Sequence, residues 1–163
     1  MEADAYQAEL LFSQKYRQYS TMLYRLAMIY LGNAYDAEEA VQEAFIRLLY
    51  KAPSFVDAEH EKRWLLRVQI NICKDILKSG WRSRTVHLEE AGSYQMDSDS
   101  LYIMERLVSL PQKYKSVIYL HYYEGYQLQE IADLLGIGLS AAKMRMKRGR
   151  ELLRMELEVE ADG

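Results

Sequence analysis

Apolar residues recur every three to four positions along most of this chain, which is the spacing of one face of an α-helix. No segment shows the strict alternation of apolar and polar residues that is typical of a half-buried strand. In the first half, the pattern predicts three long helices, over residues 6–31, 36–51 and 60–79. Each is followed by a residue that ends helices, namely Gly32, Pro53 and Gly80. Asp36 with Glu39 resembles a capping box and predicts the start of the second helix.

A polar segment separates these helices from the rest of the chain. Residues 83–100 read SRTVHLEEAGSYQMDSDS and lack helical periodicity, and such a composition indicates a flexible linker. Beyond it, the pattern predicts four more helices, over residues 101–109, 112–123, 128–135 and 140–157. We therefore expect an all-α fold of two small helical domains, residues 6–82 and 101–157, joined by the linker 83–100.

Composition narrows the class of protein. Half of the 163 residues are apolar, which indicates a globular chain. No stretch approaches the roughly 18–20 uninterrupted apolar residues that cross a bilayer, and the acidic start MEADAYQAEL is unlike a secretory signal. The single cysteine, Cys73, has no partner for an internal disulfide, which fits a reducing compartment. These features predict a cytoplasmic protein that is not itself a membrane protein.

Charge is distributed unevenly along the chain. The net charge of −3 by itself argues against nucleic-acid binding. Residues 62–84, however, carry +6 and residues 140–154 carry +5, whereas the segments around them are acidic. Two separate basic segments predict two contacts with a polyanion, although ordinary solvated helix faces would also explain them.

The second basic segment belongs to a pattern typical of a helix-turn-helix. Residues 127–150 read QLQEIADLLGIGLSAAKMRMKRGR: a short helix, a turn containing Gly136, and a helix that is basic from its first turn. The residues expected to pack the two helices together are Ile131, Ala132, Leu135, Ile137, Ala142 and Met146. The small Ala132 lets the helices approach closely, so that the second can enter the DNA major groove. A generic helical hairpin with a basic outer face is the alternative.

Residues 107–154, from LVSLPQKY to KRGRELLR, resemble the C-terminal, promoter-reading domain of sigma factors of the extracytoplasmic-function (ECF) group. The resemblance rests on Leu-Pro at the start, Tyr-Glu-Gly and Glu-Ile-Ala around the first helix, and Lys-x-Arg-x-x-Arg before Leu-Leu. It implies that the last helix contacts the minus-thirty-five promoter element through Ser140, Lys143, Met144, Arg145, Lys147 and Arg148. The chain departs from the family at Ser140-Ala141-Ala142, where Gly-Thr-Val is usual, and at Gly149, where Ala is usual.

Two helices of the first half resemble the same family independently. Residues 36–50, DAEEAVQEAFIRLLY, resemble the helix that binds the clamp helices of the largest polymerase subunit, and residues 63–78 resemble the next helix, which contacts the minus-ten element. The implied polymerase contacts are Asp36, Glu39, Gln42, Glu43 and Phe45. The implied minus-ten contacts, which share one helix face by their spacing, are Arg63, Arg67, Asn71, Lys74 and Lys78.

Residue patterns typical of catalysis are missing from the sequence. His60, His87 and His121 are scattered, and neither they nor Cys73 have a recurrent metal-ligand spacing. Gly-rich phosphate loops and nucleophile motifs such as Gly-x-Ser-x-Gly do not occur. We expect no metal, no cofactor, no small-molecule substrate and no enzyme activity.

The sequence therefore predicts a sigma factor whose partners are core RNA polymerase, bound at the clamp helices of its largest subunit, and promoter DNA. The resemblance also implies an anti-sigma factor. The alternative is a stand-alone helix-turn-helix transcription regulator that dimerises through its N-terminal helices, against which the net charge and the acidic second helix argue. A polymerase-binding decoy is a third hypothesis, against which the basic residues on both predicted DNA faces argue.

Overall fold

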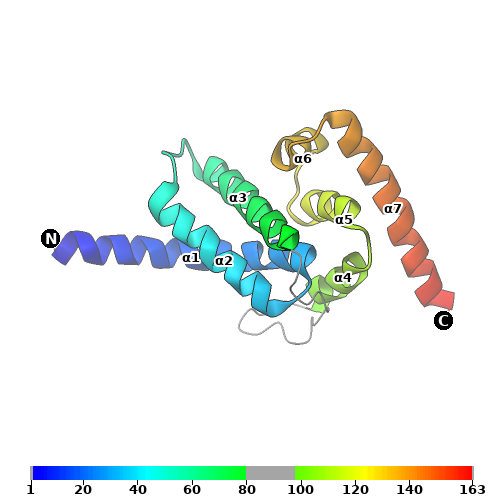
Figure 1. Ribbon diagram of the computed structural model, residues 1–163, viewed down its shortest axis with the longest axis horizontal. Coiled ribbons are helices and arrows are strands. Elements are labelled where there is room, and N and C mark those ends of the chain that lie inside the picture. The colour runs from blue at the N-terminus through cyan, green and yellow to red at the C-terminus, as the bar shows by residue number, and fades with distance from the viewer. Residues whose placement is uncertain (1, 80–97, 163) are drawn as a thin grey trace.

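A computed structural model describes residues 2–79 and 98–162 of the chain, and within these ranges all regular structure is helical. The helices form two bundles that lie side by side (Figure 1). The predicted all-α class is therefore confirmed. Residues 80–97, which include the expected C-terminal glycine Gly80 and most of the expected linker, lie outside the described residues, whereas residues 98–100 belong to a helix.

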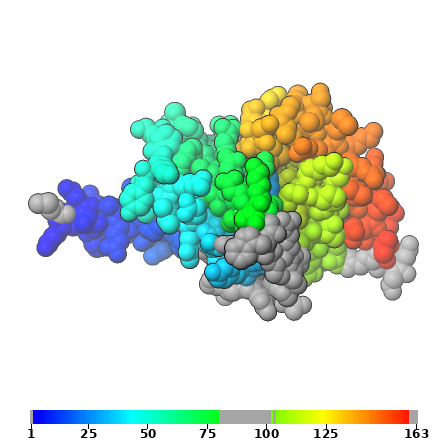
Figure 2. Space-filling model, viewed as in Figure 1, coloured from blue at the N-terminus to red at the C-terminus, as the bar shows by residue number. Residues whose placement is uncertain are grey.

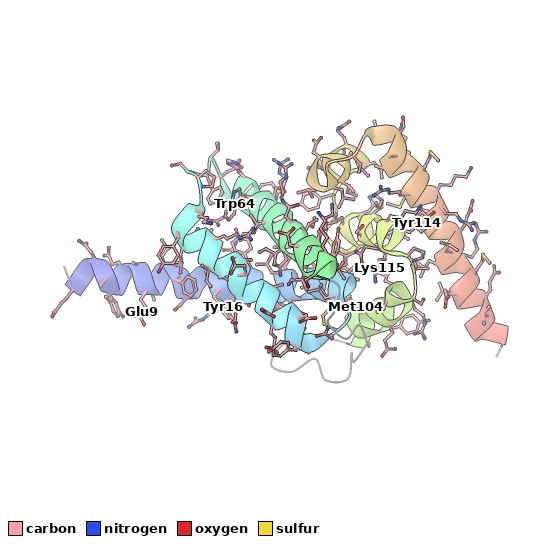
Figure 3. All side chains as sticks on the ribbon, in the orientation of Figure 1. Glu9, Tyr16, Trp64, Met104, Tyr114 and Lys115 are labelled. Atoms are coloured by element: carbon pink, nitrogen blue, oxygen red, sulfur yellow. The ribbon has the colours of Figure 1, made fainter. Side chains whose placement is uncertain are left out.

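The first bundle consists of α1 (Glu2–Leu31), α2 (Ala34–Lys51) and α3 (Ala58–Lys78). In α1, the first half projects from the bundle, where Glu9 and Tyr16 mark its course (Figure 3). The second half is buried over almost every residue from Tyr19 to Leu31, because α2 and α3 both pack on it. Gln69 of α3 reinforces this packing by donating a hydrogen bond to the Leu23 carbonyl oxygen.

The start of α2 differs from the prediction. Gly32 has a φ of 73° and ends α1, and Asn33 then caps α2 in an extended conformation. The Asn33 side-chain oxygen accepts a hydrogen bond from the Asp36 backbone N–H at 2.9 Å. Asp36 is thus the third residue of the helix rather than its cap. The cap of α3 is Asp57, which accepts from the His60 N–H, so this helix starts slightly earlier than predicted.

The second bundle consists of α4 (Ser98–Val108), α5 (Gln112–Ile118), the π-helical turn η2 (Tyr119–Tyr123), α6 (Leu128–Leu135) and α7 (Leu139–Asp162). The predicted helix over residues 112–123 is therefore one continuous helical segment whose last part is wider. In this part, the Glu124 N–H donates to the Tyr119 carbonyl oxygen five residues earlier. The last helix ends five residues later than predicted, because its acidic end stays helical.

The two bundles share one hydrophobic core. Contacts join α1 to α5 and α3 to α6, and the buried apolar residues of both bundles form a single cluster. The space-filling view shows α3 beside the second bundle, and α3 contacts α6 (Figure 2). The relative position of the bundles is therefore determined by packing.

Gly149 explains how closely α7 packs on α5. A Cβ atom at this position would lie 2.7 Å from the Ile118 Cδ1 atom and 3.4 Å from the Tyr114 Cβ atom. These separations are shorter than, or at the limit of, ordinary van der Waals contact, so the absence of a side chain lets the helices approach. Glycine costs about 1 kcal/mol relative to alanine in a helix interior, and here close packing offsets that cost.

We expect Gly149→Ala and Ile118→Val to be coupled. In the wild-type background, the new methyl group meets Ile118, so Gly149→Ala loses most of the roughly 1 kcal/mol that alanine normally adds to a helix. Ile118→Val removes the Cδ1 atom and leaves only the looser 3.1 Å contact of Cγ1, so the same substitution should then be more favourable than in the wild-type background. Urea unfolding of the four proteins should give a coupling free energy of at least about 0.5 kcal/mol. Additive effects would contradict this account of the glycine.

Candidate nucleic-acid and polymerase interfaces

The end of the second bundle has the geometry of a helix-turn-helix. Gln127 and Glu130 form a capping box at the start of α6, and Gly136 ends it with a φ of 68°. The Ile137 N–H then donates to the Ala132 carbonyl oxygen at 3.0 Å, which closes the turn. The residues predicted to join the two helices are buried or half-buried, namely Ile131, Ala132, Leu135, Ile137, Ala142 and Met146.

One face of α7 is exposed and basic. The exposed residues recur at offsets of three or four, and they are Ser140, Lys143, Met144, Lys147 and Arg148. Arg148 donates a hydrogen bond to Glu151 on the next turn at 3.1 Å. Arg145 differs from the other predicted contacts, because it is half-buried on another side of the helix. Of the basic residues nearby, Arg150 is held by Tyr122, whose hydroxyl oxygen accepts from its Nε at 2.6 Å.

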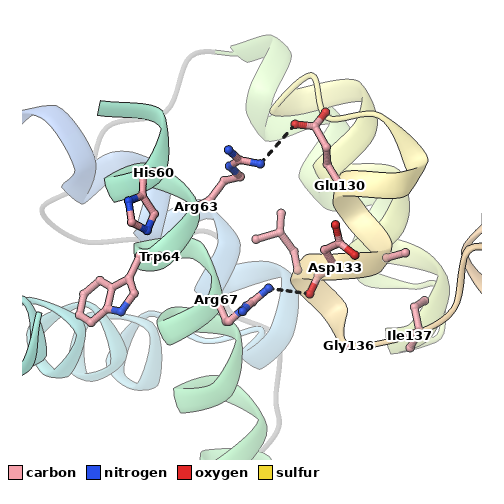
Figure 4. A pocket seen from close by; sticks show the side chains of 10 residues that line it. His60, Arg63, Trp64, Arg67, Glu130, Asp133, Gly136 and Ile137 are labelled. Atoms are coloured by element: carbon pink, nitrogen blue, oxygen red, sulfur yellow. Dashed lines mark hydrogen bonds and ion pairs between the residues drawn. The ribbon is translucent and has the colours of Figure 1, made fainter. Parts of the chain in front are cut away.

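The predicted minus-ten residues follow one side of α3, and the first two point at the second bundle. Arg67 donates a hydrogen bond to the Asp133 carbonyl oxygen at 2.9 Å. The Arg63 guanidinium lies 3.8 Å from the Glu130 carboxylate (Figure 4). It also lies 3.7 Å from the Glu59 carboxylate on its own helix. The remaining members of the set lie farther along α3, where Asn71 and Lys78 are exposed and Lys74 is half-buried.

A cavity of about 490 Å³ lies between α3 and α6. Arg63, Trp64 and Arg67 line it on one side, and Asp133 and Ile137 line it on the other (Figure 4). The Trp64 ring packs edge-on against Phe55, with centroids 5.6 Å apart, and is half-buried. The cavity therefore combines cationic and aromatic side chains from α3 with the turn of the helix-turn-helix.

Three of the five predicted polymerase contacts share one groove. Glu39, Gln42 and Glu43 line a depression of about 330 Å³ between α2 and α3, together with Ile46, Arg47, Ile72, Asp75 and Ile76. Glu43 pairs with Arg47 at 3.3 Å. The groove is thus rich in carboxylate and amide groups with apolar walls.

The structure places the other two predicted polymerase contacts, Asp36 and Phe45, outside this groove and in the interior. Phe45 is only 3% exposed and packs against the rings of Phe12 and Tyr16. Asp36 is 6% exposed and accepts a hydrogen bond from the Asn33 side chain. Phe45 thus packs α2 against α1, whereas Asp36 takes part in the cap at the start of α2.

Contacts between the bundles also involve residues that the sequence pattern does not single out. The Lys62 ammonium lies 3.3 Å from the Glu124 carboxylate and 5.3 Å from the centre of the Tyr126 ring. The Arg25 guanidinium stacks over the Tyr123 ring at 5.1 Å. Ion pairs between distant residues leave no periodic signal in a sequence, so only a covariation signal could have found them.

The described residues were also considered as possible metal ligands, membrane-spanning helices and reactive thiols. Among them, no group of three His, Cys, Asp or Glu side chains could hold a metal ion. No helix in this part of the chain is long and apolar enough to cross a membrane. Cys73 is fully buried, and burial raises the pKa of its thiol well above the ordinary value, so that it stays protonated and unreactive at neutral pH.

Comparison with known proteins gives a consistent set of relatives. The model of "Sigma-70 region 2" matches residues 16–83, and that of "Sigma-70, region 4" matches residues 100–153. The ECF RNA polymerase sigma factor SigW of Bacillus subtilis is 30% identical over 158 residues, which cover 85% of this chain and 84% of the relative. The RNA polymerase sigma factor SigV of the same organism is 29% identical over 141 residues, with 84% and 85% covered.

Solved structures show the same fold. The sigma factor RpoE of Bartonella quintana, crystallised with the anti-sigma factor NepR, superposes with a TM-score of 0.73 at 21% identity, covering 91% of this chain and 97% of that one. CnrH, in complex with the cytosolic domain of CnrY, superposes with a TM-score of 0.67 at 21% identity, covering 93% and 90%.

We expect Lys147→Ala to weaken binding of a mixed-sequence DNA duplex in a salt-dependent way. Lys147 is exposed on the basic face of α7, so its loss should remove about one phosphate contact and reduce the slope of log affinity against log salt by about 0.9. Fluorescence anisotropy at several salt concentrations measures this slope. The control is Lys51→Ala, which removes the same charge from the exposed end of α2. Equal losses in both variants would contradict a local DNA face on α7.

Proposed function

The chain belongs to the ECF group of sigma-70 family RNA polymerase sigma factors, and we propose that it directs core RNA polymerase to promoters. The observation that carries this proposal is the pairing of two helical bundles, each with a basic helix face, in the order of sigma regions 2 and 4. Two weak DNA contacts in one molecule reinforce each other through effective concentration. The protein acts where polymerase acts, in the cytoplasm.

In this proposal, α7 reads the minus-thirty-five element. Its exposed face offers Lys143 and Lys147 for phosphates, Arg148 for phosphates or guanine, and the exposed Met144 for apolar contact with bases. Arg145, which is half-buried on another side of α7, contacts the phosphate backbone at the edge of this face. Ser140, in the first turn, adds a hydroxyl group close to the helix N-terminus, where phosphate binding is favoured.

The basic side of α3 binds the minus-ten element. The arginines and lysines along it hold the phosphates of the melted strand, and the amide of Asn71 is suited to pairing with an exposed base edge. Because the strand must be single for its base edges to be reached, binding energy at α3 favours the open promoter over the closed one. The reaction therefore needs no catalytic group in this protein, which acts by binding and is not an enzyme.

The groove between α2 and α3 binds the polymerase. Its carboxylates and amide, from Glu39, Gln42 and Glu43, complement a basic helical partner such as the clamp helices of the largest subunit. Ile46, which is exposed beside them, supplies an apolar contact. Control by an anti-sigma factor completes the proposal. It is supported by the solved complexes of RpoE with the anti-sigma factor NepR and of CnrH with the cytosolic domain of CnrY.

The first test is reconstitution of transcription. Purified protein is added to bacterial core polymerase on fragmented genomic DNA, and the RNA 5′ ends are mapped. We expect discrete start sites that share an upstream and a downstream element and that are absent with core alone. Binding to core without new start sites would favour a decoy, and duplex binding without any effect of core would favour a stand-alone regulator.

We expect Glu43→Lys to weaken binding to core polymerase about tenfold, because it reverses a charge in the groove. The equilibrium dissociation constant, measured with fluorescently labelled protein, gives the effect. Glu9→Lys makes the same change of charge on the exposed, projecting half of α1 and serves as the control. If both variants bound core like the wild type, the groove would not be the polymerase site.

A further inference from the structure

The loop between α2 and α3 is held by a histidine side chain of α3. The loop, residues 52–57, ends at Asp57, whose carboxylate accepts from the His60 backbone N–H at 2.8 Å. The His60 ring holds the loop in turn, because its Nδ1 atom accepts a hydrogen bond from the Val56 backbone N–H at 3.1 Å. We propose that His60 is a positioning residue for the melted strand, and that its neutral ring keeps the loop in the conformation that binds single-stranded DNA beside α3. This inference rests on the proposed function of α3.

The two hydrogen bonds form a reciprocal cap at the start of α3. In a capping box, the third residue of the helix is a glutamate or glutamine whose side chain accepts from the backbone N–H of the N-cap residue. In α3 the third residue is His60, and its ring reaches one residue farther back, to Val56. The ring therefore fixes the backbone that enters α3, and it does so through an acceptor atom that a proton can block.

Aromatic packing joins this loop to the predicted DNA face. The Phe55 ring packs edge-on against the His60 ring, with centroids 5.3 Å apart, and edge-on against Trp64 at 5.6 Å. His60 and Trp64 lie together on the first turns of α3 and line the same cavity as Arg63 (Figure 4). Val56, next to Phe55, is 87% exposed. The loop thus presents an apolar side chain beside cationic groups, which suits a base whose neighbouring phosphates those cations hold.

Only the neutral form of the His60 ring can accept the hydrogen bond from Val56. A protonated imidazole carries an N–H group on both nitrogen atoms and has no acceptor left, so protonation releases the Val56 N–H. Histidine is the side chain that ordinarily changes its charge between about pH 5 and 8. The held loop, and the single-strand binding that depends on it, are therefore expected at neutral pH and are lost as the pH falls.

The charged groups around the ring belong to the cap and first turns of α3 and to α6. Asp57 and Glu59 lie at the start of α3, Arg63 lies one turn farther along, and Glu130 and Asp133 line the side of the cavity formed by α6. A protonated ring adds one positive charge to this surface and by itself would strengthen the binding of a polyanion. Release of the loop weakens binding instead. The sign of the pH effect therefore distinguishes a positioning role from a purely electrostatic one.

The first measurement needs no DNA. Proton–nitrogen correlation spectra of the full wild-type chain are recorded between about pH 8 and pH 5.5, together with the signals of the His60 ring. We expect the Val56 amide proton to shift upfield and to exchange faster with water at low pH, with the same midpoint as the His60 ring, because it loses its acceptor. A Val56 amide proton that does not follow the titration of His60 would overturn the proposal.

The second measurement compares the binding of a mixed-sequence single-stranded DNA at about pH 7.5 and about pH 5.5, at constant ionic strength, by fluorescence anisotropy. His60→Asn is the matched variant, because the Asn Oδ1 atom is also bonded to Cγ and can accept from the Val56 N–H but does not titrate. We expect the wild type to lose about two- to fivefold more affinity than the variant at the lower pH, and the two proteins to bind equally at the higher pH.

All other titratable groups are common to the two proteins, so their contribution cancels in the comparison. An equal pH dependence of both proteins, or a wild type that gains affinity over the variant at low pH, would contradict the positioning role. Urea unfolding at both pH values verifies that each protein stays folded. The proposed function fails separately, if the wild type produces no promoter-specific start sites with core polymerase at neutral pH. The spectra of the free chain do not depend on that result, so the two failures are distinguishable.

Discussion

Burial of the second half of α1 on every side is the constraint around which the described structure is arranged. From Tyr19 to Leu31 almost every residue of this helix is buried, whereas a helix at the surface of a bundle hides only one stripe. The stretch can be covered only if α2 and α3 pack on one side and elements of the second bundle, chiefly α5, pack on the other. The same burial brings α3 and α6 together, so the polar contacts of Arg63 with Glu130 and of Arg67 with Asp133 follow from an apolar requirement.

This arrangement places the three candidate surfaces on different sides of a single core. The groove of Glu39, Gln42 and Glu43 lies between α2 and α3, the basic side of α3 faces α6, and the basic face of α7 points outward. A factor that must hold a polymerase and two DNA elements needs such separation, because each partner is large. The basic side of α3 differs from the other two surfaces in that two of its residues, Arg63 and Arg67, also contact α6.

The structure gives a physical reason for Gly149, which departs from the family pattern. Considered by its helix propensity alone, this glycine only lowers the stability of α7. In the packed bundle it is the point where α7 approaches Ile118 of α5. The basic face of α7 is held on the opposite side of the helix by this contact, so the glycine affects the position of the recognition helix and not only its stability.

The sequence by itself determined the helices, the helix-turn-helix and the family, because periodicity, glycine turns and motif spacing act over a few residues. Even there, a detail differed: Gly32, with its positive φ, ends α1, and Asn33 rather than the predicted Asp36 caps α2. Only the tertiary structure decided that Phe45 and Asp36 turn inward, and that Arg67 bonds to Asp133, 66 positions away. Such contacts depend on how whole helices pack. The spacing of lysines and arginines along a sequence is the same whether their side chains face water, DNA or another helix.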